Sequence, residues 1–130
     1  MADAVTSQTL VDGDRNLVMK FTNVSDGTGE AAVLKVDVSG LSGFGGWSKV
    51  RIDRIIAHTS GMAVNILWDA TTDVTCFVIG QDACMEHDFR SFGGLTNNAG
   101  AGVTGDINFT TIGHTANDTY SIILHMTKQP

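Results

Sequence analysis

The chain has 130 residues, of which 42% are hydrophobic and 17% charged, and its formal net charge is -6. This composition excludes an intrinsically disordered chain, and no run of residues approaches the ~20 apolar positions that a transmembrane helix needs. The eight Lys and Arg residues are scattered, which argues against a nucleic-acid partner because phosphate binding needs clustered basic groups. We therefore expect one soluble domain over residues 1–130, with no membrane contact.

The apolar residues alternate with polar ones along most of the chain, and this period of two is typical of half-buried strands. In chain order, the alternating segments are residues 17–22, 32–39, 49–56, 64–69, 74–78, 107–111 and 120–127. Turn-forming residues separate them, at positions 12–14, 26–29, 60–61, 70–73 and 117–118. The sequence predicts an all-β fold, a single-domain antiparallel β-sandwich of about eight or nine strands with jelly-roll-like topology.

The same alternation assigns side chains to the core or to the surface. We predict a core between the two sheets that contains Met19, Phe21, Leu34, Val36, Ile52, Ile66, Trp68, Phe109, Ile122 and Leu124. The residues between them, such as Lys35, Asp37, Arg51 and Asp53, are predicted to form polar cover on the outside of the sheets.

Groups that could carry chemistry are few. Residues 84–88 (CMEHD) combine thiol, imidazole and carboxylate groups, but neighbouring residues of an extended chain point to opposite sides, so this segment is interpreted as a polar sheet edge. The loop with Asp26, Thr28 and Glu30 lacks the longer pattern of oxygen ligands that calcium sites have. No nucleophile elbow of the form G-x-S-x-G is present. We predict no enzyme activity, no metal site, no cofactor, and two unpaired cysteines in a reducing cytoplasm.

Binding residues are expected in loops and at the N-terminus, because loops on a rigid scaffold are where such residues gather. Residues 1–9 are predicted as a possible N-terminal arm. The glycine-rich stretches 39–47 and 93–105 carry large apolar side chains. The predicted partner contacts are Val5, Leu10, Phe44, Trp47 and Leu95. The alternative is that the apolar loop residues fold back on their own sandwich.

Three blocks of the sequence carry a resemblance to a known group of proteins. They are residues 17–30 (LVMKFTNVSDGTGE), 66–74 (ILWDATTDV) and 92–100 (FGGLTNNAG). In these blocks, and from about Leu17 to Lys128, the chain resembles small virion structural proteins of tailed bacteriophages, and among them it is most similar to capsid decoration, or cement, proteins.

The resemblance implies a β-sandwich or jelly roll, often assembled as a homotrimer, with no catalytic residues. It further implies that the protein is made in the host cytoplasm and binds the major capsid protein on the outer face of the head, which it stabilises. Two alternatives stay open at this point: a tail, neck or fibre-associated structural module, and a carbohydrate-binding module.

Overall fold

The computed structural model describes residues 4–13, 15–27, 30, 32–37, 49–97, 105–113 and 115–129. The strands of this part are β1 (Ala4–Asp12), β2 (Asn16–Asp26), β3 (Val33–Val36), β4 (Lys49–Ser60), β5 (Ala63–Trp68), β6 (Val74–Ile79), β7 (Cys84–Asp88), β8 (Ile107–Ile112) and β9 (Ala116–Gln129). A short 3-10 helix, η2 (Arg90–Phe92), follows β7.

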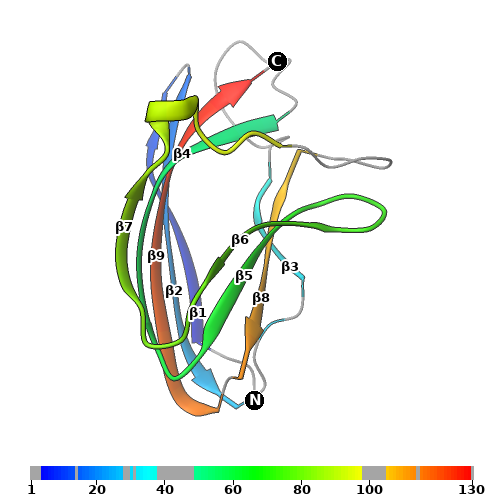
Figure 1. Ribbon diagram of the computed structural model, residues 1–130. Helices are drawn as coiled ribbons and strands as arrows, with labels where there is room; N and C mark the ends of the chain where they lie inside the picture. Colours follow the sequence, from blue (N-terminus) through cyan, green and yellow to red (C-terminus); the bar gives the residue numbers. More distant parts are fainter. Residues whose placement is uncertain are drawn as a thin grey trace.

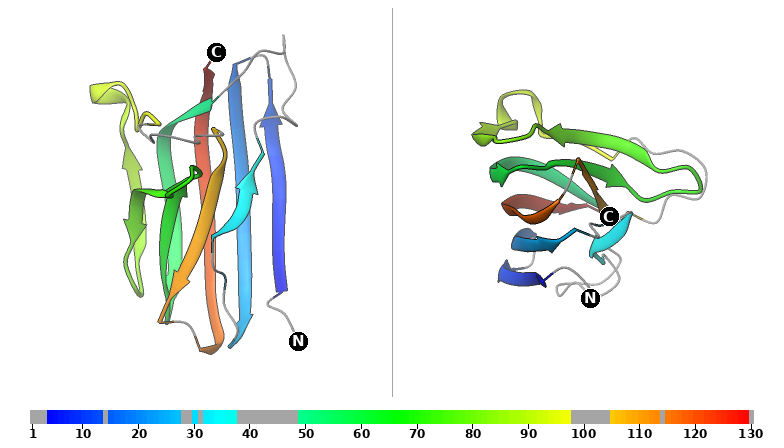
Figure 2. Two further views of the ribbon diagram at one scale, coloured as in Figure 1. Left: turned by 90° about the vertical axis from the view of Figure 1, so that its right-hand side faces the viewer. Right: turned by 90° about the horizontal axis from the view of Figure 1, so that it is seen from below.

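The strands form two antiparallel sheets that face each other (Figure 1). The first sheet has five strands in the order β1-β2-β9-β4-β7, and the second has four strands in the order β3-β8-β5-β6. Figure 2 shows the smaller sheet in front of the larger one, whose strands run in the long direction of the molecule. The prediction of an all-β antiparallel sandwich is confirmed.

The core lies between the two sheets and contains most of the predicted residues. Phe21 on β2 and Phe109 on β8 make an edge-to-face contact across the core, with ring centroids 5.1 Å apart. Tyr120 on β9 meets the same Phe109 ring at 5.9 Å. Of the predicted core, Phe21, Val36, Ile52, Ile66, Trp68, Phe109, Ile122 and Leu124 are buried, and Met19 is partly buried against them.

The prediction was wrong for β3, where Leu34 is 50% exposed and Lys35 is buried. The pairing of β3 with β8 shifts its register between Leu34 and Val36, which makes Lys35 the extra residue of a β-bulge. A bulge moves all following residues to the opposite face, so a simple period of two fails at this point. Lys35 therefore points inward, and Val36 after it still reaches the core.

A buried ion pair compensates for the charge that the bulge brings inside. Lys35 Nζ lies 2.5 Å from Glu30 Oε2, and both side chains are at most 4% exposed. Glu30 Oε1 accepts hydrogen bonds from the Tyr120 hydroxyl at 2.5 Å and from Asn23 Nδ2 at 3.0 Å. Tyr120 and Asn23 belong to the five-stranded sheet and Lys35 to the four-stranded one. The network thus joins the two sheets through the core.

From Ala4 onward, the predicted N-terminal arm is part of the five-stranded sheet and not a separate arm. This segment is β1, which pairs with β2 along its length. Buried Lys128 on β9 pairs with Asp12 and so fastens the end of β1 to the sheet. The hydrophobic pattern missed β1 because an edge strand of Ser, Thr and Gln is held mainly by backbone hydrogen bonds, which leave no apolar period in the sequence.

Removing the positive charge of Lys35 should destabilise the fold strongly. We expect Lys35→Met to cost about 3–5 kcal/mol, because Glu30 stays buried without its counter-charge. Combining it with Glu30→Gln should recover most of that loss, since the amide oxygen still accepts from Tyr120 and no net charge is buried. Denaturant unfolding measures both effects.

Leu34→Ala serves as the matched control on the same strand. Its side chain is half exposed, so we expect a change within about 0.5 kcal/mol. The bulge assignment fails if Leu34→Ala is the costly substitution and Lys35→Met the harmless one.

Candidate functional site: the outer face of the five-stranded sheet

The side of the five-stranded sheet that points away from the core carries a mixture of apolar and charged side chains. On β9, Ile123 and His125 alternate with the buried Ile122 and Leu124, so they point outward. The strand register extends this surface to neighbouring strands. We call it the outer face, and it comprises Val18, Lys20, Arg54, Ile56, His58, Cys84, Glu86, Asp88, Ser121, Ile123 and His125.

A shallow apolar depression of about 420 Å³ lies in the middle of the outer face. Ile123 is paired with Ile56 on one side and with Lys20 on the other. Both isoleucines are half-buried and line the depression. His58 and Glu86 also line it, so an apolar floor is bordered by groups that can donate or accept hydrogen bonds.

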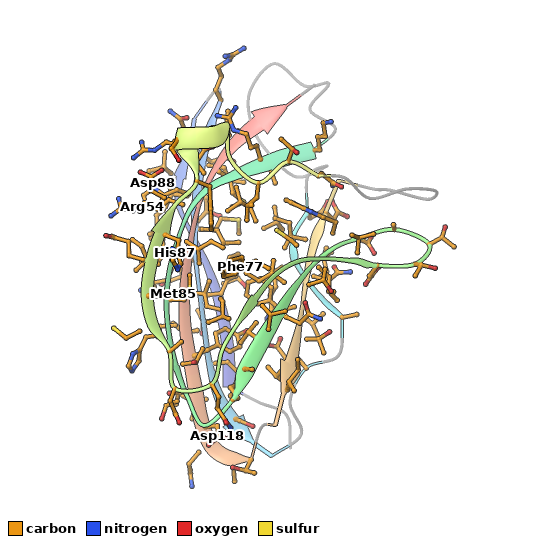
Figure 3. All side chains as sticks on the ribbon, in the orientation of Figure 1. Arg54, Phe77, Met85, His87, Asp88 and Asp118 are labelled. Atoms are coloured by element: carbon orange, nitrogen blue, oxygen red, sulfur yellow. The ribbon has the colours of Figure 1, made fainter. Side chains whose placement is uncertain are left out.

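A second depression of about 350 Å³ is lined by charged and polar groups, among them Arg54, Arg90 and His125. Arg54 forms an ion pair with Glu86 on the adjacent strand β7. Figure 3 shows Arg54 and Asp88 close together beside β7, as their pairing in the register requires. The two depressions therefore lie next to each other on β4 and β9.

Asp88 is held by Arg90, which follows it in the 3-10 helix. The Arg90 backbone N–H donates to Asp88 Oδ1 at 2.9 Å, and the guanidinium donates through Nε at 3.0 Å and Nη2 at 2.5 Å. These side-chain hydrogen bonds, together with the charge of Arg90, hold the pKa of Asp88 well below its usual range. Because the folded pKa is lowered, Asp88 contributes to stability above its ordinary pKa, and this contribution is lost as the pH falls towards the folded value.

The outer face differs in charge from the chain as a whole. Together with the lining of the second depression, it carries the basic groups of Lys20, Arg54 and Arg90 against the carboxylates of Asp53, Glu86 and Asp88. The whole chain has a net charge of -6, so the rest of the molecule is the acidic part. Such a face fits a partner that presents aliphatic side chains bordered by charged groups of both signs.

The five residues of β7 are divided between the two sides of the strand. Glu86 and Asp88 lie on the outer face, while Met85 and His87 point inward, where the His87 ring stacks on Phe89 with centroids 6.1 Å apart. In the described part of the chain, no three His, Cys, Asp or Glu side chains gather as a metal ion would need. Glu30, from the loop considered for calcium, is instead in the buried ion pair.

The predicted partner residues lie in separate places. Val5 and Leu10 are on β1, where Leu10 is 51% exposed. Leu95 exchanges two backbone hydrogen bonds with Ile52, at 3.0 and 2.7 Å, and packs against the core. Leu95 thus follows the alternative reading, in which a loop residue folds back on its own sandwich. Phe44 and Trp47 lie outside the described residues.

The sequence contains one signal for the outer face. Two strands contain adjacent isoleucines, Ile55-Ile56 and Ile122-Ile123. Successive side chains of a strand point to opposite sides, so one member of each pair has to face outward. The register then places the two outward members, Ile56 and Ile123, side by side.

Comparisons with protein-family models, with curated proteins and with solved structures find no match for the chain. In the described ranges, no helix has the length and apolar character needed to cross a bilayer.

The two cysteines should differ strongly in reactivity. Cys84 is exposed at the apolar depression, whereas burial raises the pKa of Cys76 to about 12. Because the thiolate is the reactive form, we expect a thiol-alkylating reagent at neutral pH to modify Cys84 first, as read by peptide mass spectrometry. The variant Cys84→Ser should leave only slow labelling in the folded protein. Equal rates at both thiols would contradict the strand assignment of β6 and β7.

Proposed function

We propose that this chain is a non-enzymatic virion structural protein of a tailed bacteriophage, a capsid decoration protein that binds the major capsid protein on the outside of the head and stabilises the shell. The sequence blocks at residues 17–30, 66–74 and 92–100 support this proposal by their resemblance to such proteins. The antiparallel sandwich agrees with the fold that the resemblance implies.

We also propose that the sandwich is a jelly roll. After β1, the strands occupy the sheets in the order β2-β9-β4-β7 and β3-β8-β5-β6. Among the strands of the described residues from β2 to β9, only β5 and β6 follow each other within one sheet, and every other step crosses between the sheets. Two interleaved Greek keys produce this alternation, and they define the jelly roll.

We propose that docking occurs through the outer face of the five-stranded sheet. Its half-buried isoleucines, Ile56 and Ile123, can be covered by a partner at little cost, because they are already partly exposed to solvent in the free protein. Ion pairs at the border, such as Arg54 with Glu86, give orientation rather than much affinity. Many weak contacts of this kind, repeated over a shell, bind with avidity. On the shell, copies gather as homotrimers.

Docking should depend on the outer face and not on the opposite side of the sandwich. We expect Ile123→Glu to fold normally and to lose binding to undecorated heads, because it places a carboxylate on the apolar floor. The matched control is Val78→Glu on the four-stranded sheet, where Val78 is 50% exposed, and it should bind like the original chain. Co-sedimentation with purified heads measures the difference.

The opposite pattern, with Val78→Glu defective and Ile123→Glu normal, would show that the other sheet docks. A head role is contradicted if the original chain does not bind heads and is present in purified virions in only a few copies. The tail, neck or fibre module would then be the better proposal.

A further inference from the structure

The two sheets of the sandwich have four edges, and three of them are protected against pairing with another strand. Native proteins shorten, bulge or charge their edge strands for this purpose. β7 has five residues and carries the ion-paired Glu86 and Asp88. β3 has four residues and contains the bulge at Lys35, and β6 has a register shift at Cys76.

The fourth edge, β1, is different. It has nine residues and is the last strand of the five-stranded sheet (Figure 2). From Ala4 to Val11 it contains no charged residue and no proline. Its described side chains from Thr6 to Val11 are exposed, and its register is regular until the irregularity at Leu10. In the described part of the chain, β1 therefore offers a regular row of backbone donors and acceptors from Ala4 to Thr9, with no charge, proline or bulge before Leu10.

We propose that β1 pairs antiparallel with β1 of a second copy of this chain, about a two-fold axis at Ser7, so that the two five-stranded sheets become continuous. In this register Ser7 faces Ser7 of the second copy, and Thr6 faces Gln8. These uncharged polar pairs form favourable cross-strand contacts. A neutral edge also matters for self-association, because each copy has a net charge of -6 and charged edges of like sign would repel.

The exposed apolar side chains favour a second copy over a different protein. Leu10 and Val11, which are 51% and 48% exposed, lie at one end of β1. Val24, which is 51% exposed, lies beside Ala4 at the other end. An antiparallel two-fold pairing at Ser7 places Leu10 of one copy opposite Ala4 of the other, one strand away from Val24, and does so twice. The same surface is thus complementary to itself.

This pairing does not depend on the proposed function. In free protein it gives a dimer, and on a shell it would join copies of neighbouring trimers. The docking test changes Ile123 and the pairing test changes Thr6 and Gln8, so the two tests alter different residues.

The test uses two double variants that differ only at residue 6. Thr6→Glu with Gln8→Glu places like charges opposite each other across the two-fold axis, and we expect the mass measured by sedimentation equilibrium to fall twofold, from dimer to monomer. Thr6→Lys with Gln8→Glu places opposite charges there and should keep the dimer. Within each copy, residue 8 faces Lys20 on β2, so Gln8→Glu is compatible with the fold, which circular dichroism checks.

A net-charge control completes the design. Thr71→Glu with Thr72→Glu adds the same two charges at exposed positions of the β5–β6 loop, and it should stay dimeric. The proposal is overturned if the original chain is a monomer at all concentrations, which would leave β1 for a strand of another protein. It is also overturned if the two residue-6 variants behave alike, or if the loop variant dissociates as well.

Discussion

The buried ion pair between Lys35 and Glu30 is the constraint on which the arrangement of the two sheets depends. A charge inside the sandwich is tolerated only where it is fully compensated, and here Tyr120, Asn23 and the counter-charge of Lys35 all converge on one carboxylate. Because the donors come from both sheets, sliding one sheet over the other would break several of these interactions at once. The apolar core supplies most of the stabilisation, while this network fixes how the sheets are placed.

Much of the fold could be predicted from the sequence, because the period of two in residues such as Phe21, Ile66 and Ile122 reflects burial on one side of a strand. The failures have physical causes. The burial of Leu34 and the exposure of Lys35 were predicted the wrong way round, because a bulge changes the alternation of side chains without any local signal in the sequence. β1 was missed because the backbone hydrogen bonds that pair it with β2 do not require alternating apolar side chains. The only sequence signal for the outer face was the adjacent isoleucines. That two of them lie side by side on neighbouring strands could not be predicted without the strand register.

The same architecture separates surfaces of different character. The outer face combines an apolar floor with paired charges, which is the composition of a surface that loses water on contact with a partner. Ion pairs protect the edge strand β7 of this sheet, whereas the edge strand β1 carries no charge from Ala4 to Val11. A rigid sandwich that binds with one face and extends through one edge is suited to covering a curved, repetitive surface. These features are consistent with the resemblance to decoration proteins and are the physical reasons for proposing that role.

A reconstruction of purified virions by electron cryomicroscopy would locate the chain and show its orientation in one experiment. We expect sandwiches on the outside of the head, with Ile56 and Ile123 of the five-stranded sheet turned towards the major capsid protein. Heads without this chain, or sandwiches that contact the shell through the four-stranded sheet, would contradict this expectation.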